Sequence, residues 1–551
     1  MKKFFIGILI ILLLAIGVFF FVENRDSNTI SKKYDGFSFI SEGEDIDPTD
    51  FDRIDGQFYL SLEYIKDHID KDVVYDENEK VVILTNQAGT KYLPFEEKTA
   101  TFNGGKVDLR SPVIEKNGKI MLPIEAFIYD YDVNLRYDQD RQLLLLDRTD
   151  REYAEGIGKT NVILREEHQK SSPIVKKLEK GEKLYVYGEE GKYYRVRQIE
   201  GLAGYVKKDD IKVDFPQNKF ERTIIEEKQK EALEPLNLTW DYTYGNQSDE
   251  SVTKIKKIPG LNVICPTWFS IRNNQGDLID RGNLNYVEKY QDMNVDVWGY
   301  LDNSFDKDIT HEALKSPTTR KKIIAKTLEL CKKYKMTGIN IDFEDTYIDD
   351  RDLITQFVRE LASEFKKENL IVSVDVTPQI SPDVTKEPYD RKALANICDY
   401  VIVMTYDQHW GSSDTAGSVA QYKWVEGSIN VLFRNIPNDK MVLGIPLYSR
   451  LWVEDNDKVS SSTISMSEVN RLIEEKKLEP EWDEESSQYY IEYRENGKIY
   501  KVWIEDYKSI EHKSSLVNKY NLAGVGTWRK GFETQDIWKA IDKQLSYRKN
   551  R

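Results

Sequence analysis

Cysteine and histidine are scarce in this chain. Its three cysteines, Cys265, Cys331 and Cys398, stand far apart among 551 residues and form no C-x-x-C pair. This spacing excludes a disulfide scaffold and the common zinc and thioredoxin signatures. The five histidines are scattered, and none belongs to the H-E-x-x-H pattern of a zinc-binding helix. We therefore expect neither a metal ion nor another cofactor.

Basic charge and phosphate-binding motifs are lacking as well. Lysine and arginine number 79 against 95 aspartates and glutamates, which gives a net charge of −16. A nucleic-acid partner requires a basic surface, so we exclude nucleic acid as the main partner. The chain has no Walker loop, no G-x-G-x-x-G and no G-x-S-x-G motif. These absences disfavour nucleotide hydrolases, dinucleotide enzymes and serine hydrolases.

One long hydrophobic run stands at the amino terminus. Phe4–Val22 is an unbroken stretch of apolar residues and glycines that follows Lys2 and Lys3. As a helix it would measure about 28 Å, close to the ~30 Å hydrocarbon core of a membrane. We therefore predict a transmembrane anchor within residues 1–25, with the remainder outside the membrane. A cleaved signal peptide is the alternative, in which case the protein is secreted. In both cases we expect export, and with a retained anchor the remainder of the chain lies at the cell surface.

Residues 34–150 contain an internal repeat. Asp55–Leu62 and Asn117–Ile124 share one pattern at an offset of 62 residues, and Val81–Leu84 and Leu143–Leu146 continue it. Each copy predicts a turn, a strand, a short helix and a hairpin. The segment resembles the copper amine oxidase N-terminal-like domain of bacterial surface proteins. Since it holds one histidine and no cysteine, we predict no metal, and we interpret it as a spacer or a wall-facing module.

Residues 155–213 read as several short strands separated by glycine-containing turns. Leu178–Glu182 and Gly204–Val206 are similar to elements of a bacterial SH3-like domain. This resemblance implies that the segment binds peptide or glycan of the cell wall. A packing spacer is the alternative.

The segment 216–551 is long enough for a (β/α)8 barrel. Amphipathic helical patterns such as Thr318–Lys335 and Leu353–Glu368 alternate with strand-like runs, which favours a closed parallel sheet. The gap between the last two runs is too long for one crossover, so we predict a small α+β insertion at about 451–515. The eight predicted strands are Leu236–Tyr242, Leu261–Thr267, Val295–Tyr300, Gly338–Phe343, Leu370–Val376, Tyr400–Tyr406, Met441–Leu447 and Ala523–Trp528.

The fourth predicted strand carries unusual polar residues. Side chains alternate between the two faces of a strand, so Asn340, Asp342 and Glu344 should line the barrel interior. Buried carboxylates are costly unless they are paired or used. Glu344 falls at the carboxyl end of the strand, where barrel enzymes carry their catalytic groups.

Four motifs in order are similar to family 18 of the glycoside hydrolases, the chitinase-type barrels. They are Gly338–Glu344, Met404–Asp407, Gly444–Arg450 and Gly524–Trp528, and the resemblance covers about residues 235–545. The first motif looks most like the subgroup of Gram-positive cell-wall and spore-germination hydrolases. This chain has Thr337 and Asn340 where the family usually has aspartates. The relay of aspartates below the catalytic acid is therefore shortened, and we expect this to affect the pH profile and the rate of hydrolysis.

The resemblance implies a retaining, substrate-assisted mechanism. Glu344 would be the general acid, with a pKa raised by burial beside Asp342. Asp342 would hold the N–H of the substrate's 2-acetamido group, and Tyr406 would bond its carbonyl oxygen, which attacks C1. Trp528 would form the floor of the sugar site. The other implied substrate-binding residues are Asp407, Tyr448, Asn340, Met404, Arg450 and Trp410.

We expect a glycosidase that cleaves β-1,4 bonds after N-acetylglucosamine, with cell-wall peptidoglycan as the preferred polysaccharide. Two alternatives stay open. One is a chitinase acting on chitin oligosaccharides, and the other is a surface glycan-binding protein that has lost turnover. Glu344 and Asp342 favour the enzyme, whereas Asn340 favours the binding protein. The membrane is a further expected partner, through the amino-terminal helix.

Overall fold

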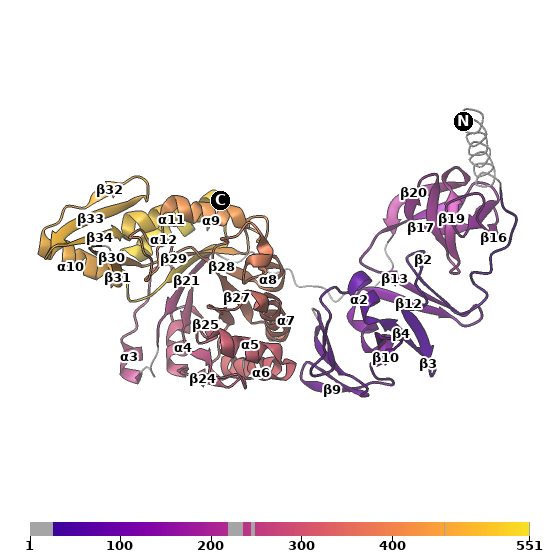
Figure 1. Ribbon diagram of the computed structural model, residues 1–551, viewed down its shortest axis with the longest axis horizontal. Coiled ribbons are helices and arrows are strands. Elements are labelled where there is room, and N and C mark those ends of the chain that lie inside the picture. Colours follow the sequence, from indigo (N-terminus) through magenta and orange to yellow (C-terminus); the bar gives the residue numbers. More distant parts are fainter. Residues whose placement is uncertain (1–25, 87, 219–234, 244–247, 457, 550–551) are drawn as a thin grey trace, which may run out of the picture. The chain divides into compact units, whose positions relative to one another are not determined.

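The computed structural model describes residues 26–86, 88–218, 235–243, 248–456 and 458–549. The chain divides into two compact units, Met1–Lys228 and Gln229–Arg551. Figure 1 shows the described part of the first in indigo to magenta and that of the second in magenta to yellow.

The internal repeat forms the first part of the amino-terminal unit. In each copy a hairpin leads into a helical turn, which is α2 (Leu62–His68) in the first copy and a 3-10 turn, Ile124–Ala126, in the second. Leu60 pairs with Leu122 between β4 and β11. The two copies therefore meet in one antiparallel sheet, with this equivalent pair of residues opposite each other, and they share one core. The strands are β1 (Ser38–Ser41), β2 (Glu44–Asp45), β3 (Phe51–Ile54), β4 (Gln57–Ser61), β5 (Val74–Asp76), β6 (Val81–Asn86), β7 (Gly89–Pro94), β8 (Thr99–Phe102), β9 (Gly105–Asp108), β10 (Ile114–Lys116), β11 (Lys119–Pro123), β12 (Val133–Asp138) and β13 (Leu143–Arg148).

The second part of this unit is a seven-stranded sheet in the order β16-β15-β19-β18-β17-β14-β20. Its strands bury an apolar cluster that includes Leu164, Val196 and Val206. The strands are β14 (Tyr153–Gly158), β15 (Val162–Arg165), β16 (Ile174–Leu178), β17 (Lys183–Glu190), β18 (Tyr193–Gln198), β19 (Ala203–Lys207) and β20 (Ile211–Asn218).

A buried ion pair joins the two parts. Arg197 on β18 contacts Asp147 on β13 with 2.6 Å between Nη2 and Oδ2, and both side chains are almost fully buried. The Tyr187 hydroxyl also donates to Asp147, at 3.0 Å. Beside them Leu143 and Leu145 pack against Ala203. Because a buried charge is tolerated only with its partner, this junction fixes the two parts to each other.

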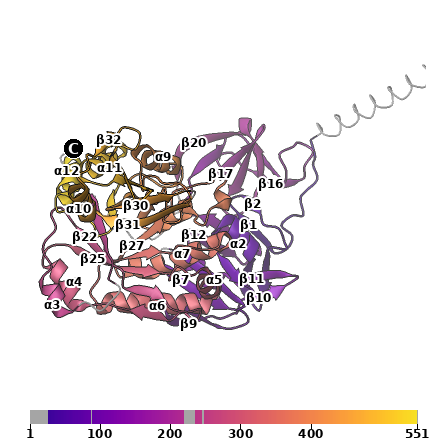
Figure 2. The same cartoon turned by 60° about the vertical axis from the view of Figure 1, so that its left-hand side comes forward.

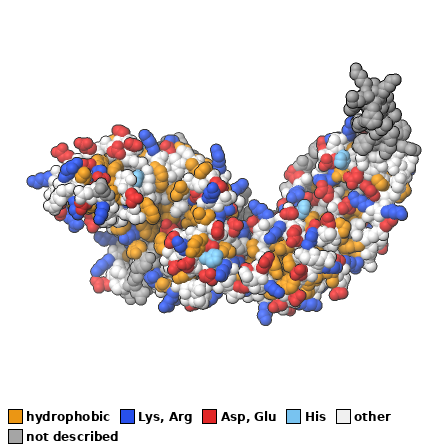
Figure 3. All heavy atoms as spheres, in the orientation of Figure 1, with side chains coloured by type: hydrophobic (Ala, Val, Ile, Leu, Met, Phe, Trp, Pro, Cys, Tyr) orange, Lys and Arg blue, Asp and Glu red, His pale blue; other side chains and the backbone are white. Residues whose placement is uncertain are grey.

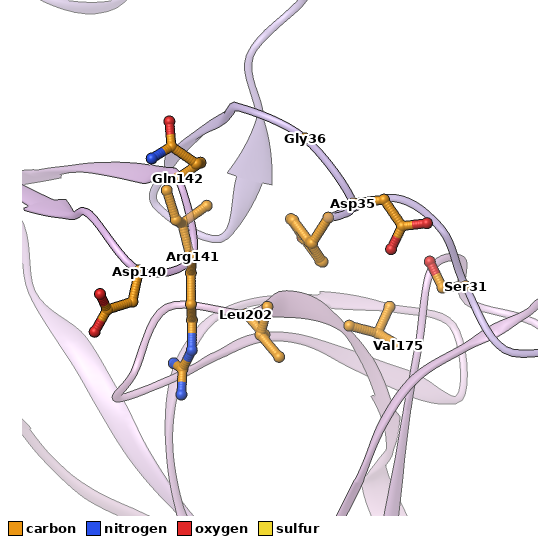
Figure 4. A pocket seen from close by; sticks show the side chains of 10 residues that line it. Ser31, Asp35, Gly36, Asp140, Arg141, Gln142, Val175 and Leu202 are labelled. Atoms are coloured by element: carbon orange, nitrogen blue, oxygen red, sulfur yellow. The ribbon is translucent and has the colours of Figure 1, made fainter.

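Next to the junction lies a cavity of about 380 Å³. Figure 4 shows Ser31 and Asp35 on one side of it and Asp140 and Arg141 on the other. The Arg141 guanidinium is paired with the Glu200 carboxylate at 2.6 Å. The lining residues are Ser31, Tyr34, Asp35, Gly36, Asp140, Arg141, Gln142, Leu143, Val175 and Leu202.

The carboxy-terminal unit is a closed barrel of eight parallel strands. Closure is completed because β22 pairs in parallel with both β21 and β25. Each observed strand agrees at both ends with a predicted run to within two residues. The barrel strands are β21 (Leu236–Asp241), β22 (Val263–Pro266), β25 (Asp296–Asp302), β26 (Gly338–Asp342), β27 (Ile371–Val376), β28 (Tyr400–Met404), β29 (Met441–Pro446) and β35 (Gly524–Trp528), with a hairpin of β23 (Phe269–Ile271) and β24 (Leu278–Asp280) added after β22.

Helices cover the outside of the barrel, as Figure 2 shows for α4 and α6. The predicted helices are confirmed as α6 (Pro317–Lys333) and α7 (Arg351–Lys367). Ser316 caps α6 by accepting from the backbone of Thr319, and Pro317 at its first turn needs no N–H partner. The other helices are α3 (Asp249–Thr253), α4 (Leu284–Gln291), α5 (Lys307–Lys315), α8 (Arg391–Ile397), α9 (Tyr422–Leu432), α11 (Tyr507–Tyr520) and α12 (Ile537–Lys549).

An α+β insertion separates the seventh and eighth barrel strands. It is a five-stranded antiparallel sheet in the order β31-β30-β34-β33-β32, with α10 (Met466–Lys476) packed on one face. Its own core includes Val469, Ile491 and Val502. The strands run from residue 448 to residue 504, and α11 already belongs to the barrel. They are β30 (Tyr448–Asp455), β31 (Lys458–Ser465), β32 (Glu481–Asp483), β33 (Gln488–Glu495) and β34 (Lys498–Ile504).

The expected fold class is wrong in its transmembrane helix. Within the described ranges, every helix is too short or too polar to cross a membrane. The apolar run at residues 4–22, on which that prediction rested, lies outside the described residues. Over the face seen in Figure 3, acidic and basic side chains are interspersed, in keeping with the modest acidic surplus.

Candidate active site

Strand β26 has the alternation that the sequence predicts. Asn340 and Asp342 point into the barrel, and both are buried. Ile339, Ile341 and Phe343 belong to the large apolar cluster between the strands and the outer helices. The polar side chains therefore lie inside the barrel, and Glu344 follows at the carboxyl end.

Asp342 is held from the neighbouring strand. The Tyr300 hydroxyl on β25 donates to its Oδ2 at 2.6 Å. Burial raises the pKa of Asp342 to about 7, against the opposing effect of the Tyr300 hydrogen bond and with a further contribution from Asp302. Its second oxygen, Oδ1, is buried and has no hydrogen-bond partner among the described residues. This oxygen is the one available to a further donor.

Glu344 is positioned through its backbone. The side chain of Asn303 donates from Nδ2 to the Glu344 carbonyl at 2.7 Å and accepts from the Glu344 N–H at 3.1 Å. Asn303 is itself fully buried and also bonds Thr310. Burial, followed by the negative charges of Asp342 and Asp407, raises the pKa of Glu344 to about 9. At neutral pH Glu344 is therefore protonated, the state that a general acid requires.

Below Asp342, a buried polar network surrounds Asn340. The Trp240 indole N–H donates to Oδ1 of Asn340 at 2.8 Å. The amide Nδ2 donates to Asp375 Oδ1 at 2.8 Å and to Ser373 Oγ at 3.0 Å, both on β27. Burial and the nearby Asp342 charge raise the pKa of Asp375 well above its usual range.

Two tyrosines close the site on the side of strand β28 and the loop after β27. Tyr406 follows β28 at the carboxyl end of the barrel. Burial, followed by the negative charges of Asp342 and Glu344, raises the pKa of its hydroxyl well above the usual range. Tyr389 donates to the backbone oxygen of Phe343 at 2.7 Å. The bond from Tyr389 fixes the backbone of Phe343, which directly precedes Glu344.

A further group of polar residues surrounds Asp407, which follows Tyr406. The Tyr448 hydroxyl and Nη2 of Arg450 both donate to Oδ1 of Asp407, each at 2.7 Å. The predicted residues Asp407, Tyr448 and Arg450 therefore lie together. Asp407 also contributes to the raised pKa of Glu344, which connects this group with the acid.

The remaining predicted residues occupy different depths. Trp528 is partly exposed at the end of β35 and packs against Trp240 and Tyr242, with ring centroids 5.9 and 6.4 Å apart. Met404 is buried at the end of β28. Trp410 is 63% exposed on the loop after that strand. Asn340 is fully buried below Asp342, so its contacts are with protein side chains.

Sequence reasoning missed Tyr300, Asn303 and Asp375. For Asp375 a signal was present, because Ser373-Val374-Asp375 repeats the alternation of Asn340-Ile341-Asp342 on the neighbouring strand. Tyr300 stands alone between Gly299 and Leu301 in its strand, and Asn303 stands in an ordinary polar run, Asp302-Asn303-Ser304, so no local pattern marks either residue. Among the described residues, no cluster of three or more histidine, cysteine or acidic side chains could hold a metal ion.

Three family models match the chain in the predicted order. They are the copper amine oxidase N-terminal domain over residues 44–146, the bacterial SH3 domain over 160–212 and the glycosyl hydrolases family 18 over 264–532. The three resemblances found in the sequence are thereby confirmed.

Similar proteins match a little over half of this chain. The chain is 30% identical over 329 residues to the uncharacterized glycosylase YvbX of Bacillus subtilis (strain 168), which covers 57% of this chain and 93% of that protein. It is 24% identical over 315 residues to the cortical fragment-lytic enzyme of the same organism, covering 55% and 72%. The crystal structure of the Bacillus cereus spore cortex-lytic enzyme SleL covers 56% of this chain and 73% of its own, with 22% identity and a TM-score of 0.51, a likeness of fold.

Proposed function

The chain belongs to family 18 of the glycosyl hydrolases and is a glycosidase, and we propose that it cleaves β-1,4 linkages after N-acetylglucosamine in cell-wall peptidoglycan. The observation that carries this proposal is the pairing of a protonated Glu344 with Asp342 at the carboxyl end of β26. Glu344 has a pKa of about 9 and Asp342 a pKa of about 7. Two carboxyl groups with separated pKa values suit an acid and an anion that act together.

In the proposed mechanism Glu344 protonates the glycosidic oxygen. The oxygen of the substrate's own 2-acetamido group attacks C1, so no carboxylate of the protein is needed as nucleophile. Water then opens the resulting oxazolinium ring, Glu344 takes back a proton from that water, and the configuration at C1 is retained.

Asp342 and Tyr406 would hold the acetamido group. The free Oδ1 of Asp342 suits the acetamide N–H as an acceptor, and its negative charge would stabilise the positive ring. The Tyr406 hydroxyl would donate to the acetamide oxygen and aim it at C1. Both roles agree with the electrostatic effect of Asp342 and Glu344 on the Tyr406 hydroxyl.

The sugar would rest on Trp528, whose partly exposed ring suits the apolar C–H face of a pyranose. Asp407, Tyr448 and Arg450 form a rigid polar group beside the acid that could bond sugar hydroxyls. Met404 and Asn340 are buried and would support the sugar site from beneath. Trp410 is exposed and would contact more distant sugars of the polysaccharide.

Two considerations favour peptidoglycan. The cortical fragment-lytic enzyme of Bacillus subtilis, a relative at 24% identity, is named for action on spore cortex fragments. The SH3 domain suits a protein held close to a polymeric wall. The apolar segment after Lys2 and Lys3 suggests export, so we propose that the protein acts at the cell surface.

The test is to incubate the purified protein in parallel with peptidoglycan and with chitin oligosaccharides, and to identify the products by mass spectrometry. We expect new reducing ends at N-acetylglucosamine from peptidoglycan, initially in the β configuration by NMR. Release from chitin alone would instead favour a chitinase. The Glu344→Gln variant keeps the shape of the side chain and loses the proton, so it should bind the polymer without cleaving it. Unchanged cleavage by this variant would refute the proposed acid.

A further inference from the structure

Asp375 is a buried carboxyl group next to Asp342. In the parallel ladder of β26 and β27, Asn340 pairs with Ser373 and Ile341 with Val374. The next residues along the two strands are Asp342 and Asp375, which therefore lie at the same level with both side chains inside the barrel. Asp342 is 4% exposed and Asp375 is 1% exposed.

The contacts of Asn340 determine which oxygen of Asp375 can carry a proton. The Trp240 indole N–H can only donate, so the atom of Asn340 that faces it is the amide oxygen. The amide nitrogen then faces Asp375 and donates to its Oδ1 at 2.8 Å. Because Oδ1 already accepts this bond, a proton on Asp375 belongs on Oδ2.

Two oxygens remain free in this pair. Oδ2 of Asp375 and Oδ1 of Asp342 are both buried and lack a hydrogen-bond partner among the described residues. Two neighbouring carboxylates in a buried site cannot both be ionised at little cost, so such a pair keeps one proton. A single proton between these two oxygens would satisfy both at once.

We propose that Asp375 is a positioning residue that holds a proton on Oδ2 and donates it in a hydrogen bond to Oδ1 of Asp342. The bond keeps Asp342 ionised and fixes its orientation before the substrate arrives. When the acetamide N–H reaches Oδ1, that oxygen can accept both bonds, and the proton stays on Asp375. On β26 this chain has Asn340 where the family usually has an aspartate. Asp375 on β27 thereby supplies the carboxyl group beside Asp342.

This inference rests on the proposed function for its effect on catalysis, since it concerns the same Asp342. Burial and the Asp342 charge both raise the pKa of Asp375, in the direction that retains the proton. Among the residues that the structure describes, the titratable groups that act on the pair or are acted on by it are all neutral or acidic at neutral pH. They are Cys265 on β22, Tyr300 and Asp302 on β25, Glu344 after β26, Tyr389 after β27 and Tyr406 after β28.

Two substitutions of Asp375 separate its donated proton from its volume. Asp375→Asn keeps a donor toward Asp342 and an acceptor toward Asn340, so kcat should stay within about fivefold of the wild type. Asp375→Leu removes the donor, while Asn340 keeps Ser373 as acceptor. Loss of one hydrogen bond to a buried charge should lower kcat about 10- to 100-fold with little change in KM. Asp439→Asn, an exposed aspartate before β29, is the matched control and should match the wild type.

The pH profile distinguishes positioning from packing. Without the donor, Asp342 binds its own proton more tightly, so the acid limb of kcat/KM should move up by about one pH unit in Asp375→Leu. Adding Asn340→Asp to this variant returns a carboxyl group below Asp342 on its own strand and should restore part of kcat. An unmoved acid limb in Asp375→Leu would overturn the proposal. An Asp375→Asn variant as impaired as Asp375→Leu would overturn it too.

A measurement without substrate tests the proton itself. The folded protein holds a proton on Asp375 that the unfolded chain releases above its ordinary pKa of about 4. Stability from this group is therefore complete at low pH and is lost as the pH rises toward the folded pKa. The Tm of the wild type should fall more steeply between pH 5 and 8 than that of Asp375→Asn. Equal slopes of Tm against pH in the two proteins would overturn the proposal. This test does not require activity, so it remains decisive if the wild type shows no hydrolysis and the proposed function is refuted.

Discussion

Removal of the Tyr300 hydroxyl should shift the working pH range of the enzyme. This hydroxyl is the hydrogen bond that opposes burial at Asp342, donating to Oδ2 at 2.6 Å. A hydrogen bond to a charged group is worth about 1.5–3 kcal/mol, which corresponds to about one to two pKa units. Tyr300→Phe keeps the ring in the barrel core and should raise the Asp342 pKa from about 7 by that amount.

The mechanism requires an ionised Asp342, so the loss of kcat/KM should be greatest at low pH. Near pH 6 the expected decrease is about 10- to 100-fold, and it should shrink as the pH rises toward the Glu344 pKa of about 9. The assay is the rate of cleavage of a fluorogenic N,N′-diacetylchitobioside between pH 5 and 9. Tyr131→Phe, which removes a partly buried tyrosine–aspartate bond in the amino-terminal unit, is the matched control.

A Tyr300→Phe variant with the acid limb of the wild type would refute this reasoning. It would mean that Asp342 does not need its charge, or that burial and not the hydroxyl controls that charge. A uniform loss at every pH would also refute it, because a loss of position alone does not depend on pH.

Three further outcomes follow from other contacts. Asp342→Asn should lose most of its rate because the anion beside the acetamido group is gone; a wild-type rate, with unchanged circular dichroism, would remove Asp342 from the mechanism. Asn303→Ala frees both backbone groups of Glu344, each bond being worth about 0.5–1.5 kcal/mol, so kcat should fall about tenfold while KM holds. A fall confined to KM would contradict the positioning role. Asp147→Leu removes the carboxylate that neutralises the buried Arg197 guanidinium, which should cost about 3–5 kcal/mol in calorimetric unfolding of the amino-terminal unit. An unchanged transition would show that the junction contributes nothing.

The sequence predicts the barrel well because its strands are apolar runs bounded by polar turns. Such runs can be recognised from consecutive residues alone, and each agrees with an observed strand. Strand alternation likewise predicts the inward direction of Asn340 and Asp342, a property of the local backbone.

Contacts between side chains on different strands could not be predicted from the sequence. Tyr300 bonds Asp342 across 42 positions and Asn340 bonds Asp375 across 35, and these pairings depend on the register of neighbouring strands. The amino-acid pattern within one strand does not contain that register. The predicted transmembrane helix shows a further limit, since it rested on hydropathy alone, and no helix of that kind is found in the described part of the chain.

The buried pair of Arg197 and Asp147 has a consequence for modularity. Two family models divide this unit into separate domains, at 44–146 and 160–212, and the ion pair joins a side chain from just beyond the first to one within the second. A recombination event or a cloned fragment that ends between them separates the buried guanidinium from its counter-charge. We therefore expect these domains to be inherited, exchanged and expressed together, as one evolutionary and folding unit.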